Sequence, residues 1–265
     1  MQHMIVGKTA SGECHAADTE QASAWRKDRL PEIMETYKPS DIYNADETGL
    51  FFQMLPKNTL ALKGDCHGGK QSMLRLTVLL CTNMDGSDKC VPLVIGKSAR
   101  PRSSKNAARI PIKYVANTKA RMTRSIFVEW PNELNNDMKS QRRNVCLLVD
   151  NCSAHHIQGL ELSNVQVHFF PANCTSLIQP LDQGIINGEK FAYRRCLIDR
   201  LLLNLRLNLS TKVEASHAVE MLSAVWKSTG AVIIANCFRK AGLGLCEQET
   251  AAETGTVQPG LVQAW

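Results

Sequence analysis

The sequence lacks several features that would mark a specialised class of protein. No segment approaches the roughly 20 apolar residues that cross a bilayer, and residues 1–10 have neither the apolar segment nor the cleavage pattern of a secretory signal. The apolar fraction of 44% and the charged fraction of 21% are ordinary for a globular protein. We therefore expect an intracellular chain with no membrane partner, in which 265 residues form one large domain with appendages.

The ten cysteines lack the spacing of a metal site or a disulfide framework, because no two of them form a CxxC pair. Zinc sites usually draw their ligands from such close pairs. Cys81 and Cys146 lie inside apolar runs, where a thiol behaves as a small hydrophobic side chain. The pattern favours reduced cysteines in a protein core, as is usual in the cytosol or the nucleus.

Acidic residues are absent between Asp88 and Glu129, although the net charge of the whole chain is only +6. Ten basic residues occupy that interval: Lys89, Lys97, Arg100, Arg102, Lys105, Arg109, Lys113, Lys119, Arg121 and Arg124. Such a run suits a polyanion, because each phosphate contact releases condensed counterions. The proline-containing residues 97–113 also fit a solvated basic loop, and charge alone leaves both interpretations open.

Hydrophobic patterns predict a mixed α/β sheet. Residues 42–45 form a short strand that ends in an acidic turn beginning at Asp46. Residues 74–83 and 90–95 flank an Asp-Gly pair, which is a strong hairpin signal. Residues 145–149 and 165–170 are the continuous apolar runs of strands buried on both faces. The segment between these last two runs has room for a short helix, so we expect the two strands to be parallel.

Helical patterns flank these strands. Thr19 is positioned to cap a first helix, and residues 125–139 have helical character, although Pro131 should break or kink a helix there. A long helical pattern follows Pro180. A further helix is expected over residues 214–226.

Three acidic residues stand at the ends of these elements. Asp46 closes the first predicted strand, Asp150 closes the buried strand 145–149, and Asp182 begins the long helix. Ligands of open α/β sheets gather at the carboxyl ends of the strands, so these acids are expected to converge. Close carboxylates repel unless a cation compensates them, and hard oxygen ligands suit Mg²⁺ or Mn²⁺. Taken singly, each acid could instead organise a turn or cap a helix.

The local sequences around these acids are distinctive. They are DIYNADETGL at residues 41–50, VCLLVDNCSAH at residues 145–155 and TSLIQPLDQGI at residues 175–185. They resemble the three catalytic blocks of the pogo/Tigger branch of Tc1/mariner-type transposases, a group with a DDE superfamily endonuclease domain. The resemblance covers roughly residues 20–205. It implies an RNase H-like mixed sheet, with antiparallel hairpin strands and parallel strands flanked by helices and followed by C-terminal helices.

The resemblance also implies a chemistry. Asp46, Asp150 and Asp182 would be the catalytic residues and would bind two Mg²⁺ or Mn²⁺ ions. A water molecule or a 3′-hydroxyl would attack a phosphodiester bond, so that one site both cleaves DNA and joins the freed end to a target. Asn151 and His155 are second-tier candidates that could orient the attacking water or a phosphate. For His155, a histidine on a helix surface is an equally good interpretation.

Basic side chains complete the predicted site. The candidates for DNA contacts are Lys97, Arg100, Arg102, Lys105, Lys190, Arg194 and Arg195. For the last three, on the long helix, a solvated helix face is the alternative. Glu189 on that helix adds a further acid near the site. Family members carry helix-turn-helix modules before the catalytic part, and this sequence has no room for them, so we expect electrostatic rather than sequence-specific DNA binding.

The predicted organisation is a helical lead-in at 1–40, an RNase H-like DDE catalytic domain at 41–205, C-terminal helices at 206–243 and a flexible tail at 244–265. The predicted function is a nuclear, transposase-derived DNA-binding protein with a two-metal cleavage and strand-transfer site. Its predicted partner is DNA, and a homodimer is a candidate assembly. Two alternatives stay open: a domesticated DNA-binding protein without catalytic activity, and another RNase H-like metal-dependent nuclease.

Overall fold

The computed structural model describes residues 17–54, 73–99, 112–157 and 159–244. Within these residues a six-stranded sheet has the order β4-β3-β2-β1-β5-β6. The strands are β1 (Ile42–Phe51), β2 (Arg75–Asn83), β3 (Leu93–Gly96), β4 (Lys113–Ala116), β5 (Val145–Val149) and β6 (Val165–Phe169). Strand β2 pairs antiparallel with β1 and with β3, whereas β5 runs parallel to both β1 and β6. This is the RNase H-like mixed sheet that the local motifs predicted.

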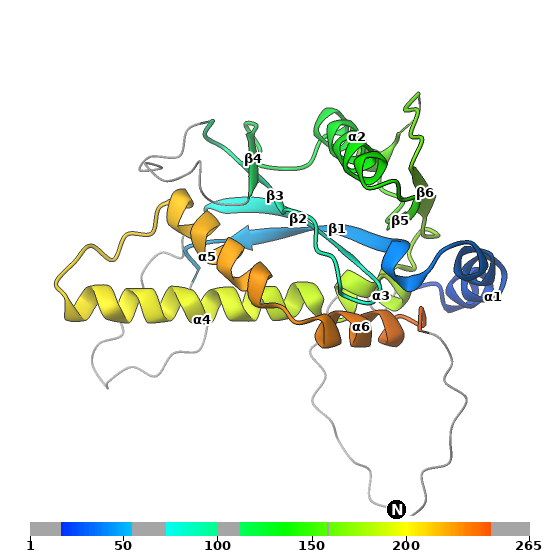
Figure 1. Cartoon of the computed structure of the whole chain (residues 1–265). Coiled ribbons are helices and arrows are strands. Elements are labelled where there is room, and N and C mark those ends of the chain that lie inside the picture. Colours follow the sequence, from blue (N-terminus) through cyan, green and yellow to red (C-terminus); the bar gives the residue numbers. More distant parts are fainter. Residues whose placement is uncertain (1–16, 55–72, 100–111, 158, 245–265) are drawn as a thin grey trace, which may run out of the picture.

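Helices cover both faces of the sheet (Figure 1). They are α1 (Thr19–Thr36), α2 (Arg124–Ser140), α3 (Thr175–Ile178), α4 (Ile185–Arg206), α5 (Ala215–Ser228) and α6 (Ala231–Lys240), with 3-10 turns η1 (Pro39–Asp41), η3 (Ser153–His155) and η4 (Pro180–Gln183). Helix α2 packs on one face, where Phe127 and Trp130 join a core with Leu79 and Leu147. Helices α1, α4, α5 and α6 share the core on the opposite face.

Two strand predictions hold because their signals are local. Strand β5 is buried at every position, as expected for a strand covered on both faces. The hairpin between β2 and β3 turns at Gly86, whose φ of +73° is a backbone conformation that glycine adopts without steric cost. The parallel pairing of β5 with β6 is also confirmed, and the short helix between them is η3.

The acidic turn predicted at Asp46 is wrong. Strand β1 continues through Asp46 to Phe51, because β2 pairs with it over this whole length, from Tyr43 opposite Asn83 to Phe51 opposite Arg75. A continuous ladder of hydrogen bonds overrides the turn preference of the Asp-Glu-Thr-Gly segment. Asp46 therefore lies in the middle of a strand and does not end it.

Three helix expectations also need correction. Helix α2 runs through Pro131 without a break, because Pro131 and its neighbours Trp130 and Leu134 are buried against the sheet. The cap of α1 is Asp18, which accepts a hydrogen bond from the backbone of Gln21, and not Thr19. Helix α6 lies within the C-terminal helices expected at 206–243, but its own bounds were not predicted, and strand β4 was not expected.

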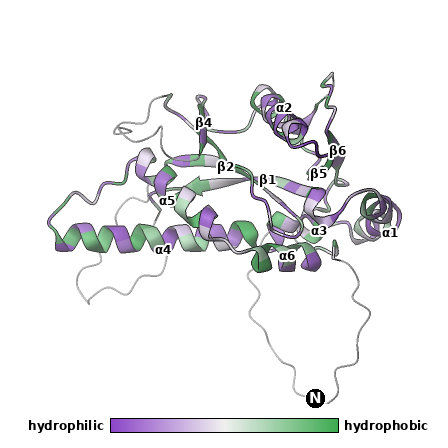
Figure 2. Cartoon of the chain, viewed as in Figure 1, coloured by the Kyte–Doolittle hydropathy of each residue, from purple (hydrophilic) through white to green (hydrophobic). Residues whose placement is uncertain are grey.

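The exposed apolar residues, the cysteines and the hydropathy of the helices are the remaining features of the fold. Figure 2 shows strongly hydrophobic turns where the far end of α4 extends past the sheet, and Leu202, Leu203 and Leu205 are at least half exposed there. Cys81 and Cys146 are buried and unpaired, as predicted. In the described part of the chain, no single helix has the length and apolarity to cross a membrane; α5 and α6 together reach that length but are bent by 80° at their junction.

Candidate catalytic site

The site begins where β1 and β5 part. The parallel pairing of these strands covers only Ile42 to Asn44 on β1, opposite Cys146 to Leu148 on β5. Beyond Asn44 this edge of β1 is open, and Asp46 follows two residues later. Asp150 directly follows the last residue of β5. Because the two strands run in the same direction, both carboxylates emerge at the same end of the pair.

A buried asparagine brings the third acid to these strand ends. Asn44 is completely buried, its side-chain Nδ2 donates to the Leu148 carbonyl at 3.0 Å, and its Oδ1 accepts from the Leu181 backbone N–H at 2.9 Å. This link fixes η4 against β1 and β5, so Asp182 lies next to the strand ends. Asp182 is therefore in the turn before α4 and not at the start of the helix as predicted.

Gly184 allows the chain to pass from η4 directly into α4. Gly184 separates η4 from α4 with a φ of +151°, outside the range that side chains tolerate. A Cβ atom there would lie 3.2 Å from the Cys237 sulfur on α6. Gly184 thus lets α4 start immediately after Asp182 while α6 packs closely beside it.

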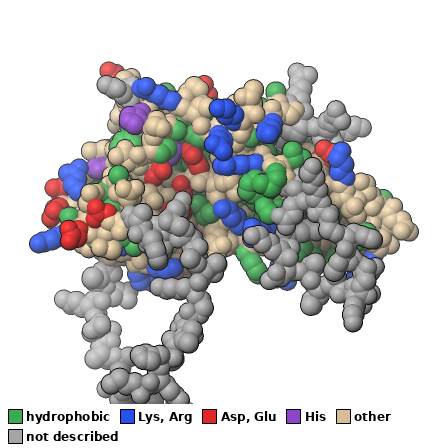
Figure 3. Space-filling view, turned by 180° about the vertical axis from the view of Figure 1, so that it is seen from behind, with side chains coloured by type: hydrophobic (Ala, Val, Ile, Leu, Met, Phe, Trp, Pro, Cys, Tyr) green, Lys and Arg blue, Asp and Glu red, His purple; other side chains and the backbone are tan. Residues whose placement is uncertain are grey.

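The three predicted acids line one cleft of about 550 Å³. Its lining residues are Asp46, Glu47, Asp150, Asn151, Cys152, Pro171, Ala172, Asn173, Thr175, Ser176, Gln179 and Asp182. Figure 3 shows acidic side chains gathered near the middle of one face of the molecule, with a group of Lys and Arg side chains beside them. Three segments far apart in sequence therefore contribute carboxylates to one hollow surface.

Asp46 is the most strongly perturbed of these acids. It is only 9% exposed, and its Oδ1 accepts a hydrogen bond from the Glu47 backbone N–H at 2.7 Å. Burial raises the pKa of Asp46 well above its usual value, and the negative charges of Asp182, Asp150 and Glu47 raise it further, against the opposing effect of that hydrogen bond. A nearby cation would relieve the crowding of these charges.

His155 compensates a different pair of carboxylates. Its Nε2 lies 2.6 Å from Glu47 Oε1, and its Nδ1 is in ion-pair contact with the Asp150 carboxylate. The ring stacks on Phe127 with 4.0 Å between ring centroids. Burial would lower the pKa of His155, but hydrogen bonds to Asp150, Cys152 and Glu47 raise it to about 12. A charged His155 thus positions Asp150.

His155 is therefore not the helix-surface histidine considered from the sequence, because it is 1% exposed. It lies within 4.8 Å of ligand atoms of Asp150 and Cys152, a spacing that a metal ion could use. Both ring nitrogens face carboxylates, however, and a protonated imidazole has no lone pair to offer a metal. We assign His155 to the support of Asp150 and not to metal binding.

The remaining oxygen atoms of the cleft fit a hard divalent cation. Gln179 is 2% exposed, and its Nε2 donates to Asp182 Oδ2 at 3.2 Å. Its Oε1 is buried and has no hydrogen-bond partner among the described residues. Carboxylates and amide oxygens, often through water, are the ligands that Mg²⁺ and Mn²⁺ prefer. The donor set of Asp46, Asp150 and Asp182, with Gln179 beside them, therefore suits these ions.

Basic side chains on α4 lie next to the acids of the cleft. Burial lowers the pKa of Lys190, as does the positive charge of Arg194, whereas the charges of Asp182 and Asp46 raise it. Lys190 and Arg194 are four residues apart and share one face of the helix. Arg195 is exposed one residue beyond that face, and Asn151 is exposed in the cleft lining. Glu189, by contrast, is buried against Thr229.

The other predicted DNA contacts divide into two groups. Lys97 follows β3 and lines a second, smaller pocket of about 310 Å³. Arg100, Arg102 and Lys105 lie outside the described residues. Sequence analysis missed two site residues, Glu47 and Gln179. Glu47 and Gln179 stand inside the quoted motifs beside Asp46 and Asp182, so those motifs could have indicated them.

Comparison with known proteins gives consistent results. Residues 73–238 match the family model described as DDE superfamily endonuclease; this range includes Asp150 and Asp182, and Asp46 precedes it. The chain is 35% identical to Tigger transposable element-derived protein 4 of Mus musculus, over 90% of this chain and 46% of that protein. It is 33% identical to Major centromere autoantigen B of Homo sapiens, over 83% of this chain and 36% of that protein.

The chain also resembles solved structures in its fold. The chain is similar to the Mos1 mariner paired end complex with Mn, with a TM-score of 0.48 and 12% sequence identity, over 91% of this chain and 68% of that chain. The chain spans less than half the length of the two curated relatives named above.

Proposed function

The chain belongs to the DDE superfamily endonucleases, and from this premise we propose that it binds DNA across the acidic cleft and cleaves a phosphodiester bond there. Asp46, Asp150 and Asp182 would hold two Mg²⁺ or Mn²⁺ ions. The observation that carries this proposal is the meeting of three carboxylates, from β1, the end of β5 and η4, in the lining of one cleft.

Each residue of the site has its own proposed role. Asp46 and Asp182 are crowded enough to gain most from a cation, since each raises the electrostatic energy of the other. His155 and Phe127 hold Asp150 in one orientation. Gln179 does the same for Asp182 through its Nε2. When bound, the metal ions would activate the attacking water or 3′-hydroxyl and stabilise the leaving oxygen.

Lys190 and Arg194 would contact the DNA backbone beside the cleft, and Asn151 would orient a phosphate or the attacking group. The same carboxylates would serve strand transfer, since only the nucleophile differs between hydrolysis and joining. A DNA substrate makes the nucleus the expected location. We also propose that the catalytic domain spans residues 41–205 and that the chain forms a homodimer.

A DNA-binding protein without cleavage activity is the second candidate. It is favoured by the similarity to Major centromere autoantigen B, whose name describes a centromere protein and not an enzyme. Both candidates place DNA on the same face. They differ in whether the three acids still support metal-dependent cleavage.

Nicking of supercoiled plasmid separates the two candidates. The purified chain, with Mg²⁺ or Mn²⁺, is compared with Asp150→Asn and with Asp137→Asn, an exposed acid on α2 that serves as the control. We expect nicking by the wild type and the control but not by Asp150→Asn. Equal nicking by all three would assign the activity to another site. DNA binding without nicking by the wild type would favour the second candidate.

A further inference from the structure

Arg75, the first residue of β2, is a cation for which the described residues provide no hydrogen-bond or ion-pair partner. It pairs with Phe51 at the end of β1. Its Nε is buried and has no hydrogen-bond partner in the described part of the chain, and no ion pair there involves its guanidinium. Removing a guanidinium from water is costly unless a carboxylate or another acceptor replaces the lost hydration.

Gly49 provides the space for this side chain. A Cβ atom at position 49 would lie 2.8 Å from Arg75 Nε and 2.9 Å from Cζ, closer than atoms in contact approach. Arg75 is paired with Phe51, two residues after Gly49, so its side chain runs back along β1 over Gly49. Any side chain at position 49 would displace it.

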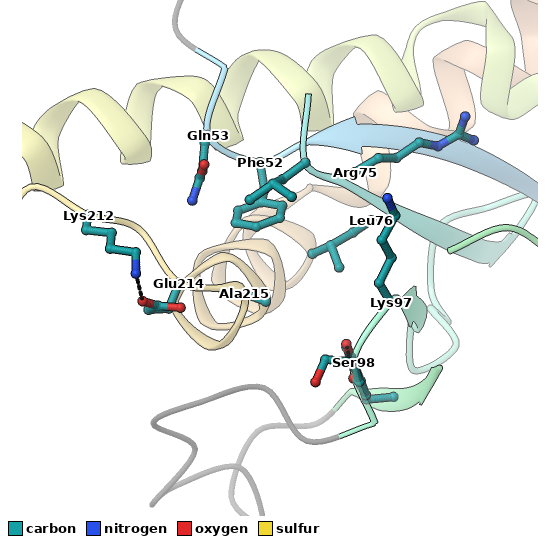
Figure 4. Close-up of a pocket in the computed structure, with 11 residues that line it drawn as sticks. Phe52, Gln53, Arg75, Leu76, Lys97, Ser98, Lys212, Glu214 and Ala215 are labelled. Atoms are coloured by element: carbon teal, nitrogen blue, oxygen red, sulfur yellow. Dashed lines mark hydrogen bonds and ion pairs between the residues drawn. The ribbon is translucent and has the colours of Figure 1, made fainter. Parts of the chain in front are cut away.

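The surroundings of Arg75 add positive charge and no free acid. Figure 4 shows Lys97 extending from the end of β3 toward Arg75, across a pocket that both residues line. The only carboxylate in the lining of this pocket, Glu214, is ion-paired with Lys212 at 3.0 Å and caps α5. Two like charges side by side, without a counter-charge, suit an anionic ligand.

Arg75 also lies within electrostatic reach of the acidic cleft. The charges of Arg75, Arg194, Asp46 and Asp182 all act on Lys190, so these side chains lie near it. Lys97 lines the same pocket as Arg75.

We propose that Arg75 binds a backbone phosphate of the DNA strand that enters the acidic cleft, with the terminal nitrogens of its guanidinium donating to the phosphate oxygens. This inference rests on the proposed function, and it adds a substrate-binding residue that the sequence motifs do not contain. Guanidinium geometry matches phosphate with two parallel hydrogen bonds, which a lysine amine cannot reproduce.

Four variants test this role in metal-free buffer, where cleavage does not interfere. They are Arg75→Gln, Arg75→Lys, Gly49→Ala and the control Lys139→Gln, which removes an exposed charge on α2. The dissociation constant for a short DNA duplex is measured as a function of salt concentration.

We expect Arg75→Gln to weaken DNA binding by about tenfold at low salt and to lower the salt slope by about one phosphate contact. Arg75→Lys should keep most of the slope but bind more weakly than the wild type. Gly49→Ala should weaken binding with the charge intact, because it displaces the guanidinium. Lys139→Gln should match the wild type.

A stability measurement separates this role from a structural one. If Arg75 awaits a ligand, Arg75→Gln should have a melting temperature equal to or above that of the wild type, because it removes an uncompensated charge. Binding by Arg75→Gln equal to that of Lys139→Gln would overturn the role of Arg75, as would a lowered melting temperature with unchanged DNA affinity. Absence of DNA binding by the wild type would instead overturn the proposed function.

Discussion

Strand β1 begins beside one charged cluster and runs through another, and the two clusters arrange their charges differently. Next to the start of the strand, Asp41 accepts hydrogen bonds from Arg143 Nε at 2.9 Å and Nη2 at 2.7 Å. The same guanidinium lies 3.6 Å from Asp88, which also accepts from the Tyr43 hydroxyl. Opposite charges here meet directly, and the cluster is complete without a ligand.

At Asp46, four residues after the start of β1, charges of like sign are grouped instead. Asp46 shares its cleft with Asp150 and Asp182, and no ion pair of Asp46 occurs among the described residues. Lys190 is within electrostatic reach of Asp46 and Asp182 and of Arg75. A ligand pair of metal cation and phosphate anion requires acids and bases close together. We therefore propose that the first cluster stabilises the fold and that the second serves binding.

His155 is the exception inside the second cluster, and its removal should have the largest effect on stability. His155→Leu leaves Glu47 and Asp150 close together without the cation between them. We expect a loss of about 3 kcal/mol in the free energy of unfolding, the usual cost of removing one partner of a buried ion pair. Urea denaturation measures this loss. The adjacent exposed His156→Leu is the control, and equal losses in both variants would deny His155 this role.

Divalent metal should stabilise only the cluster of like charges. At a metal concentration one hundred times its dissociation constant, we expect Mg²⁺ or Mn²⁺ to raise the free energy of unfolding of the wild type by about 2.7 kcal/mol. Asp46→Asn should lose most of this increase, whereas Asp137→Asn should keep it. Thermal unfolding with and without metal provides the measurement. Equal stabilisation of all three proteins would place the metal elsewhere.

Local signals explain what could be predicted from the sequence. An all-apolar segment at 145–149 between polar residues specifies β5 residue for residue, and Asp150 follows from it. The motif around Asp182 indicated the third acid because its pattern is contained in adjacent residues. The missed helix α6 has a local signal too, since Ile234, Cys237 and Phe238 are its buried face at helical spacing.

Long-range contacts explain the rest. The second half of β1 is held by β2, so its turn-like sequence gave the wrong prediction at Asp46. The hydrogen bond between Asn44 and Leu181, which brings Asp182 to the strands, joins residues 137 positions apart. Arg75 has no motif of its own, and only its position over Gly49 reveals it. Local patterns thus gave the acids, and tertiary packing gave their geometry.

Asp41, just before β1, and Asp46 within it should respond in opposite ways when each is neutralised in metal-free buffer. Asp41→Asn weakens the ion pair with Arg143 and should lower the free energy of unfolding by about 1.5 kcal/mol, a typical contribution of a charge-assisted hydrogen bond. Asp46→Asn keeps the acceptor for the Glu47 N–H but removes a buried charge crowded by Asp182 and Asp150, so it should raise the free energy of unfolding. Urea denaturation in the presence of a chelator compares the two. A loss of stability in both variants would show that Asp46 is a structural acid like Asp41.

Glu189 on α4 is neither fully paired like Asp41 nor crowded by like charges as Asp46 is. Its neutralisation should therefore change the free energy of unfolding least, mainly as a change in its dependence on pH. Burial raises the pKa of its carboxyl group, while the hydrogen bond from Thr229 and the charge of Lys89 lower it. Lys89 compensates it only partly, because its Nζ donates to the carbonyls of Trp226, Lys227 and Thr229 at the end of α5.

A carboxyl group with a raised pKa in the folded state stabilises the fold fully below its unfolded value, near 4.5, and this contribution is lost as pH rises through the folded value. Glu189→Gln should therefore flatten the fall in stability above pH 4.5 and be more stable than the wild type at neutral pH. Denaturation curves across this pH range test it, with the exposed Glu220→Gln on α5 as the control. If Glu189→Gln keeps the slope of the wild type, Thr229 and Lys89 compensate Glu189 completely, and it belongs with Asp41 among the matched charges.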